Sequence, residues 1–151
     1  MAHDLPADID YTRYTESNKW ATCINNQNTH LQIVHMNVSS FRKHFNEVLV
    51  ILQPCLSSLD IMIFTEVNLK QEELCMYNIN GFNMNSRTRQ NKRGGGIIIY
   101  SKQHLPFTIN NTNSSCELVL VHGKLTQNSY KMDIFAIYGH LIATKTYLSP
   151  K

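Results

Sequence analysis

Two polar residues that can hold or orient a cation, Asn37 and Glu66, each end a run of residues with β-strand character. Magnesium in proteins is usually bound by one or two carboxylates, and waters and substrate phosphates complete its ligands. Glu66 supplies a hard anionic oxygen, and the Asn37 amide can orient a ligand or a neighbouring carboxylate. The pair is therefore a candidate half-site for a divalent metal. The competing interpretation is that each residue only caps its strand or forms a turn.

The elements that must position this pair can be predicted from the spacing of apolar residues. Leu31–Asn37 alternates and is β-branched in its middle, which predicts a central strand. One apolar stripe predicts a helix over Phe41–Gln53, and Asp60–Glu66 is apolar on both faces, as in covered parallel strands. Strand, helix and strand then form a right-handed βαβ unit, and ligands bind at the carboxyl ends of such strands. We therefore expect the Asn37 and Glu66 side chains to lie side by side.

The rest of the chain is predicted to add further strands and loops. A loop over Asn68–Asn80 precedes a strand at Ile97–Tyr100, and Asn110–Ser115 is expected to be an exposed polar loop. Glu117–Leu125 and Lys131–Tyr138 are separated by a short turn, which predicts an antiparallel hairpin. The fold class is therefore α/β, with a mixed sheet of about six strands and at least one packed helix.

Two further groups of residues could contact a phosphate. Tyr138 ends the last predicted strand, where its phenol can donate a hydrogen bond to a phosphate or simply pack at the sheet margin. Arg87, Arg89, Lys92 and Arg93 fall within seven residues that contain no acid. They form either a basic patch for nucleic acid or a solvated loop.

Composition limits the classes of protein that need to be considered. The 151 residues carry a net charge of +3, with 42% hydrophobic and 17% charged residues, so the chain is not a disordered polyelectrolyte. The four cysteines have no zinc-ligand spacing with one another or with histidine. The N-terminus lacks the pattern of a signal peptide, and no apolar run reaches the ~18 residues of a membrane span. We expect an intracellular protein of the nucleus or cytoplasm that is neither secreted nor membrane-bound.

The order of these motifs resembles a known family. His35–Val38, the helix, Asp60–Glu66, the pair Arg87 and Arg89, and Gly94–Tyr100 follow one another as in the endonuclease/exonuclease/phosphatase family. The resemblance is strongest to the apurinic/apyrimidinic-type endonuclease domain of non-LTR (LINE-like) retrotransposons. It spans about residues 31–138 with its order preserved.

The resemblance implies a fold, a reaction and three site residues. The fold would be the N-terminal half of a four-layered α/β sandwich. The reaction would be hydrolysis of DNA phosphodiesters with Mg²⁺ or Mn²⁺ as cofactor and DNA as partner. Asn37 would be the active-site asparagine and Glu66 the metal-binding glutamate, and both residues would lie at the metal. Tyr138 would be the tyrosine near the scissile phosphate.

The departures from the family pattern are as informative as the match. Ser39 stands where some members have an aspartate, and neither a Gly-Asp-Phe-Asn nor a Ser-Asp-His motif occurs in the chain. The resemblance therefore implies that the carboxylate activating the nucleophile and the Asp–His pair contacting the phosphate are missing. Functionally coupled groups are non-additive, so losing these removes most of the rate.

These departures predict a partial endonuclease domain at residues 30–140, between a poorly ordered arm at 1–29 and a tail at 141–151. Such a chain would hold the metal weakly and would be inactive alone. The runs Ile97–Tyr100 and Leu118–Val121 are apolar on both sides, and part of this surface is expected to be exposed, which favours a complementing chain as partner. Two alternatives remain open: a non-catalytic remnant that binds DNA through the basic loop, and a phosphatase of the same superfamily.

Overall fold

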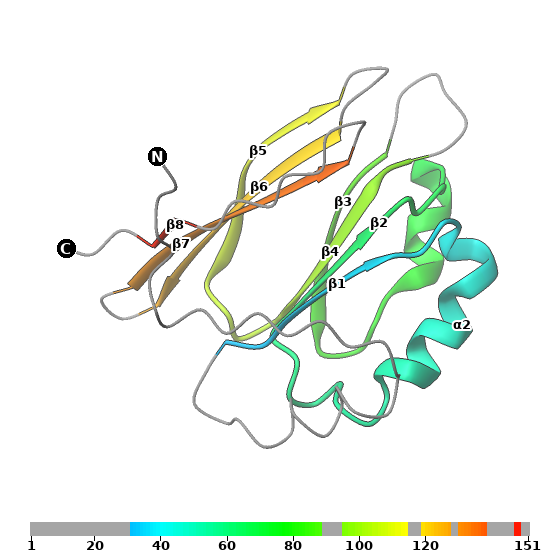
Figure 1. Cartoon of the computed structure of the whole chain (residues 1–151), viewed down its shortest axis with the longest axis horizontal. Helices are drawn as coiled ribbons and strands as arrows, with labels where there is room; N and C mark the ends of the chain where they lie inside the picture. The colour runs from blue at the N-terminus through cyan, green and yellow to red at the C-terminus, as the bar shows by residue number, and fades with distance from the viewer. Residues whose placement is uncertain (1–30, 89–94, 115–118, 128–129, 139–146, 149–151) are drawn as a thin grey trace, which may run out of the picture.

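The computed structural model describes residues 31–88, 95–114, 119–127, 130–138 and 147–148, which form a mixed α/β structure with two four-stranded sheets (Figure 1). The elements in chain order are β1 (Ile33–Asn37), α2 (Phe41–Leu52), β2 (Ile61–Thr65), the 3-10 helix η1 (Gln71–Tyr77), β3 (Phe82–Arg87), β4 (Ile97–Lys102), β5 (Phe107–Ser114), β6 (Val119–Gln127), β7 (Tyr130–Tyr138) and β8 (Tyr147–Leu148). The strand order is β1-β2-β4-β3 in the first sheet and β5-β6-β7-β8 in the second. The prediction of one sheet of about six strands is therefore wrong.

The first sheet contains the predicted βαβ unit. β1 pairs with β2 in parallel, and both β2 and β3 pair with β4 in antiparallel fashion, so the sheet is mixed. Within the described residues β1 lies at the edge of its sheet, so its predicted central place is wrong. The sequence pattern did not reveal this because β1 is apolar enough for a core strand. Its Ile33 side chain is nevertheless 41% exposed.

Aromatic packing fixes α2 against the first sheet, and the predicted helix is confirmed. The Phe41 ring lies 5.1 Å from that of Phe64 and 5.5 Å from that of Tyr77, measured between centroids. Tyr100 is fully buried in the same cluster, and its hydroxyl donates a hydrogen bond of 2.6 Å to the Tyr77 carbonyl oxygen. That bond gives the buried phenol the polar partner it requires, and burial raises its pKa. Such packing holds the βαβ unit rigid beneath the candidate site.

The second sheet packs on the opposite face of the first, so α2 and η1, the first sheet and the second sheet form three layers (Figure 1). Isoleucines of β2 and β4, among them Ile63 and Ile99, meet Leu125, Ile134 and Ala136 of the second sheet. All four residues of Ile97–Tyr100 are fully buried. The expected exposure is therefore not found at Ile97–Tyr100, because a layer of the chain's own residues covers each face of this strand. The other run of that prediction, Leu118–Val121, lies outside the residues whose side chains are described.

The second sheet confirms one prediction and corrects another. Residues assigned to the hairpin form the antiparallel pair β6 and β7. The polar loop predicted at Asn110–Ser115 is wrong over residues 110–114, which continue β5. Residues 111–114 pair with β6 after an irregularity at Asn110. Polar residues are common on edge strands, and β5 is the edge of its sheet. Asparagine-rich sequence was therefore a poor guide to the backbone pairing here.

Two other segments contain structure where the sequence predicted none. The loop expected at residues 68–80 contains η1, whose Leu74 and Tyr77 side chains join the core beneath α2. The tail expected at 141–151 contributes β8, which pairs with Met132 and Asp133 of β7. The arm expected at 1–29 lies outside the described residues. Both added elements are short, and short elements give little periodicity to detect.

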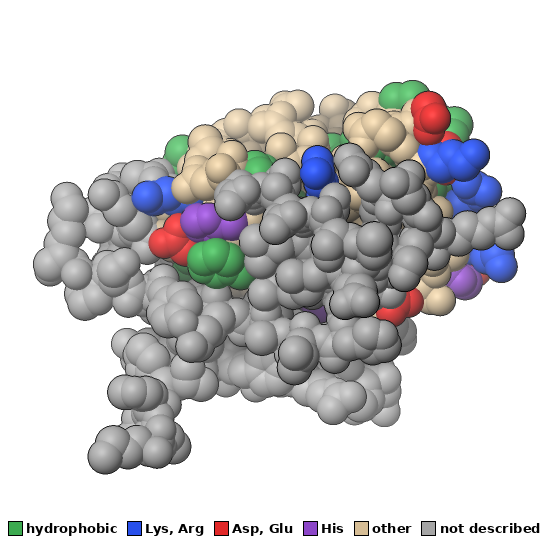
Figure 2. Space-filling model, turned by 90° about the horizontal axis from the view of Figure 1, so that it is seen from above, with side chains coloured by type: hydrophobic (Ala, Val, Ile, Leu, Met, Phe, Trp, Pro, Cys, Tyr) green, Lys and Arg blue, Asp and Glu red, His purple; other side chains and the backbone are tan. Residues whose placement is uncertain are grey.

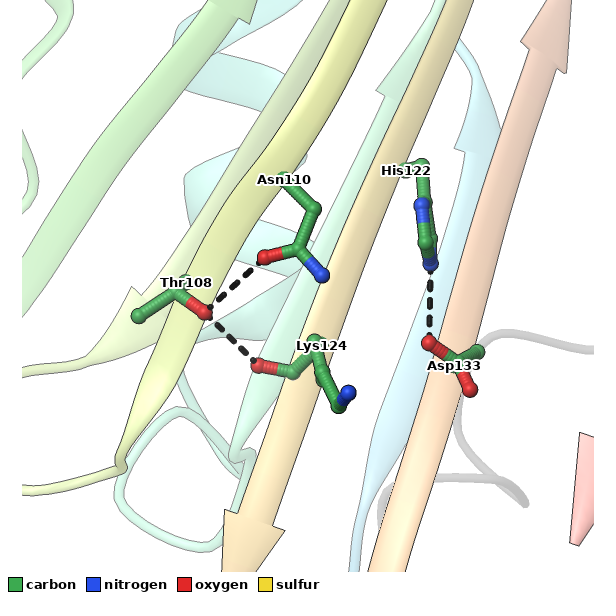
Figure 3. A network of polar contacts seen from close by, with 5 residues as sticks. All are labelled: Thr108, Asn110, His122, Lys124 and Asp133. Carbon is green, nitrogen blue, oxygen red and sulfur yellow. Dashed lines mark hydrogen bonds and ion pairs between the residues drawn. The ribbon is translucent and has the colours of Figure 1, made fainter. Parts of the chain in front are cut away.

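The outer face of the second sheet is polar (Figure 3). The His122 ring stacks on Phe135 with centroids 4.3 Å apart, and its Nε2 lies 2.8 Å from the Asp133 carboxylate. Beside them, the Thr108 hydroxyl donates to the Lys124 carbonyl oxygen at 3.5 Å. These residues alternate along their strands with the side chains that face the first sheet. This face is therefore built for polar contacts, while the inner face holds the core.

At the end of the molecule that carries α2, basic and acidic side chains lie close together on the surface (Figure 2). Arg42 of α2 pairs with Glu73 of η1, and His44 lies 2.8 Å from Glu47. This end is therefore of mixed charge. No helix among the described residues is both long enough and apolar enough to cross a membrane.

Gly123 offers a direct test of the packing between β5 and β6. A Cβ atom at Gly123 would lie 2.0 Å from Cζ of the Phe107 ring. Gly123→Ala is therefore expected to displace that ring and to lower the free energy of unfolding by roughly 1–3 kcal/mol, measured by urea unfolding. Adding Phe107→Leu should restore part of the loss, because the smaller side chain leaves room for the methyl group. Equal stability of Gly123→Ala and the wild type would contradict this close contact.

Candidate functional site

The parallel pairing of β1 and β2 brings Asn37 and Glu66 together, as the sequence predicted. Asn37 is the register partner of Thr65, and the Val38 amide donates to the Thr65 carbonyl oxygen at 3.0 Å. Glu66 follows directly, and the Asn37 Nδ2 donates a hydrogen bond of 2.9 Å to Glu66 Oε1. The pair is exposed to solvent. One carboxylate and one amide therefore meet at the carboxyl edge of the sheet, open to a ligand.

The contacts of Asn37 indicate that it orients Glu66. Its amide nitrogen faces the carboxylate, and its Oδ1 accepts a hydrogen bond of 3.2 Å from the Ser39 amide. Both ends of the Asn37 side chain are therefore engaged by the protein. Glu66 supplies the anionic oxygens of the pair, and Asn37 fixes their direction.

Three residues at this edge adopt the left-handed backbone conformation. Ser39, Glu66 and Asn68 have φ values of +55°, +58° and +54°, and they are all of the positive-φ non-glycine residues found in the described part of the chain. This conformation is uncommon for residues with a Cβ atom, and it often occurs at functional sites. Its concentration around Glu66 sets this edge apart from the other strand ends.

Asn68, which sequence reasoning missed, connects three segments of this edge. Its Nδ2 donates to the Ser39 carbonyl oxygen, and its Oδ1 accepts from the Gly95 amide. Its own backbone amide donates to the Gly95 carbonyl oxygen at 2.8 Å. Asparagine tolerates the left-handed conformation better than most residues, so an asparagine two positions after Glu66 was the available signal.

Gly96 allows the chain to pass close to this edge. Its φ is +95°, and a Cβ atom there would lie 3.0 Å from Val67 Cγ2 and 3.2 Å from the Arg87 carbonyl oxygen. The fully buried Val67 in turn accepts a hydrogen bond of 2.9 Å from the Phe41 amide at the start of α2. Glycine is therefore required at Gly96 for both its conformation and its close packing. The segment before β4 thus packs against Val67, the residue that follows Glu66.

His35, which was not predicted to be a site residue, lies on the same face of β1 as Asn37. Its Nε2 is 3.2 Å from Thr65 Oγ1, a contact that joins β1 to β2 next to the site. Although part of the residue is exposed, the desolvation of its ring lowers the imidazole pKa below its usual range. The neutral form is therefore favoured. Alternation along the strand could have placed His35 beside Asn37, but not in contact with Thr65.

Of the predicted basic patch, the structure describes Arg87. Arg87 ends β3, and its register partner in β4 is Ile97. Ile97 pairs in turn with Thr65 of β2, and Thr65 pairs with Asn37 of β1. Arg87 therefore lies in the same row across the sheet as the candidate site. Its Nε atom is buried without a hydrogen-bond partner in the part of the chain that the structure describes. The other three predicted DNA-binding residues, Arg89, Lys92 and Arg93, lie outside the described residues.

Tyr138 ends β7, where its backbone pairs in register with Val119. β7 runs in the same general direction as β1 and β2, so its carboxyl end faces the same end of the molecule (Figure 1). Nothing is described of the Tyr138 side chain, so its predicted contact with a phosphate stays a prediction.

The histidine–aspartate pair of the second sheet is not part of this site. His122 and Asp133 lie on the outer face of that sheet, away from the first sheet, whereas Asn37 and Glu66 belong to the first sheet. Among the described residues, no group of three or more histidine, cysteine, aspartate or glutamate side chains is arranged to hold a metal. Within the described ranges, the candidate metal ligands at this edge are therefore one carboxylate and the amide that orients it. Neither a family model nor a curated protein matches this sequence.

Proposed function

We propose that this chain carries one half of the active site of a divalent-metal-dependent DNA endonuclease of the retrotransposon type, and that it is inactive alone. The observation that carries this proposal is the 2.9 Å hydrogen bond between the Asn37 amide and the Glu66 carboxylate at the carboxyl edge of a parallel strand pair. Open α/β sheets bind ligands at this edge. The strained backbone of Glu66 adds support, because such strain is often retained where function requires it.

The architecture is compatible with the proposed lineage. Helix α2 covers one face of the first sheet and the second sheet covers the other. These three layers correspond to part of a four-layered sandwich, in which a further helical layer would cover the outer face of the second sheet. That the chain is the N-terminal half of such a sandwich is part of the proposal.

The residues at this edge fit a weakly held Mg²⁺ or Mn²⁺. Glu66 would be the protein ligand, and Asn37 would keep its carboxylate in place through the hydrogen bond already formed. Magnesium often accepts a single protein carboxylate when waters and phosphates supply its other ligands. When bound, such an ion activates water and stabilises charge on the phosphate.

The row of register partners from Asn37 to Arg87 favours a nucleic acid over a small phosphoester. Three strand spacings separate Asn37 from Arg87, about 14 Å, which equals the rise of roughly four nucleotides along the axis of duplex DNA. A DNA-binding module without catalysis is the second candidate, and the position of Arg87 in the same row as the candidate site favours it.

Inactivity of the isolated chain follows from the groups that the sequence does not contain. In-line attack on a phosphodiester needs an activated water, a metal and charge stabilisation together. Glu66 and Asn37 supply the metal end, but the Gly-Asp-Phe-Asn and Ser-Asp-His motifs are absent. A complementing chain would have to supply the nucleophile-activating carboxylate and the Asp–His pair.

Plasmid nicking tests this proposal. The purified chain, with Mg²⁺, is expected to leave supercoiled DNA intact, while a mixture with a polypeptide carrying the two missing motifs should nick it. Glu66→Gln keeps the size of the side chain but removes its charge, and in the mixture it should abolish nicking. Arg42→Gln is the matched surface control, because Arg42 pairs with Glu73 on the α2 face.

The outcomes separate the candidate functions. Nicking by the chain alone that Glu66→Gln abolishes would refute inactivity while keeping the enzyme class. Salt-dependent DNA binding that is never accompanied by cleavage would favour the non-catalytic module. Cleavage of small phosphoesters without cleavage of DNA would favour a phosphatase.

A further inference from the structure

Asn68 is the point at which three loops of the candidate site meet. It belongs to the segment after β2, and its side chain bonds to Ser39 after β1 and to Gly95 before β4. These three segments come from distant parts of the sequence. The Asn68 side chain thus connects three of the described segments near Glu66.

The conformation of Glu66 depends on this neighbourhood. Glu66 has φ +58° and stands between Thr65 and Val67, which are both buried. A left-handed backbone costs a residue with a Cβ atom about 1–2 kcal/mol, so surrounding contacts must hold it. Backbone bonds from Val67 to Gly96, at 3.4 Å, and from Asn68 to Gly95, at 2.8 Å, do part of this. The Asn68 side chain adds the links to two other loops.

The second link reaches Asn37 itself. The Ser39 carbonyl oxygen accepts a hydrogen bond from Asn68 Nδ2, and the Ser39 amide donates one to Asn37 Oδ1. Asn37 in turn donates to Glu66. The contacts therefore form a closed ring from Asn68 through Ser39 and Asn37 to Glu66, and back along the chain to Asn68. Breaking the ring at Asn68 therefore removes a contact that links both partners of the candidate site.

We propose that Asn68 is a positioning residue that holds the Glu66 carboxylate against Asn37. Calling this pair a metal site rests on the proposed function, but the positioning does not. The proposal separates two contributions of Asn68: its left-handed backbone, which glycine can reproduce, and its side-chain amide, which glycine lacks.

Asn68→Gly is therefore the decisive variant, measured on the full chain by ¹⁵N relaxation. It keeps the backbone conformation and the Asn68 backbone bond to Gly95 but removes both side-chain bonds. The order parameters of the Asn37 side-chain nitrogen and the Glu66 backbone nitrogen are expected to fall from rigid values to below about 0.6. Asn78→Ala is the matched control, because it removes an asparagine bond to the Cys75 carbonyl oxygen at the far end of η1.

Asn68→Asp provides a second test of the mobility of Asn37 and Glu66, and this test depends less on the stability of the variant. It keeps an acceptor for the Gly95 amide and loses the donor to Ser39, so the mobility at Asn37 should lie between those of wild type and Asn68→Gly. If Asn68→Gly does not fold, this variant decides the question in the same way. Asn37 and Glu66 as rigid as in the wild type would overturn the proposal.

A titration with Mn²⁺ on the same samples separates this proposal from the proposed function. Paramagnetic broadening at Glu66 in the wild type, together with an apparent Mn²⁺ affinity that Asn68→Gly lowers tenfold or more, supports both the metal site and the positioning role of Asn68. Absence of broadening in the wild type would count against the metal site, yet a rise in mobility at Asn37 in Asn68→Gly would still support the positioning role.

Discussion

Glu66→Gly is expected to remove divalent-metal binding and, at the same time, to give a protein more stable than Glu66→Ala by about 1 kcal/mol. Both variants lose the carboxylate that would hold the ion, so their Mn²⁺ affinity should fall by more than about tenfold. They differ in the backbone, because Glu66 has φ +58° and alanine carries a Cβ atom that this conformation disfavours. Glycine adopts it freely.

Water-proton relaxation during Mn²⁺ titration measures the first effect, and urea unfolding measures the second. Glu72→Gly is the control for the loss of a surface glutamate, because Glu72 lies in η1 and takes no part in the candidate site. An affinity for Mn²⁺ equal to that of the wild type would exclude Glu66 as the ligand. A Glu66→Gly variant less stable than Glu66→Ala would show that its backbone conformation is not strained.

Phe64→Ala is expected to have the largest effect on folding, a loss of roughly 3–5 kcal/mol in the free energy of unfolding. Phe64 of β2 is fully buried, with its ring centroid 5.1 Å from that of Phe41 and 5.8 Å from that of Tyr100. Removing the ring leaves a cavity between α2 and the first sheet. Because small domains have only about 5–15 kcal/mol of stability, most of the chain should then be unfolded or close to it.

Near-ultraviolet circular dichroism and urea unfolding measure this loss. Val50→Ala is the matched control: Val50 is 74% exposed on α2, so its truncation should change stability by less than about 0.5 kcal/mol. If Phe64→Ala and Val50→Ala unfold at the same urea concentration, the aromatic cluster does not stabilise the fold as described.

The local parts of the fold could be predicted from the sequence. Period and composition were sufficient for β1, α2, β2 and the β6–β7 hairpin, because each of these buries one or both faces and shows it in its residue types. The meeting of Asn37 with Glu66 followed from the parallel strands of a βαβ unit, whose carboxyl ends lie at the same edge of the sheet. That part of the site therefore depends on rules of local chain geometry.

The features that depend on distant partners could not be predicted. The pairing of β5 with β6, the division into two sheets and the edge position of β1 depend on which strands find each other, and a period does not encode this. The role of Asn68 depends on two hydrogen bonds to loops more than twenty-five residues away. Asparagine is frequent in this chain, so no single one stood out.

The left-handed backbone of Glu66 also bears on how this gene changes over time. A glycine or an asparagine suits φ +58° better than glutamate does, so either substitution at this position is expected to leave the fold intact. Related sequences in which the carboxylate has no function are therefore expected to carry one of these residues in place of Glu66. Retention of the acid across related sequences would indicate that selection maintains the carboxylate.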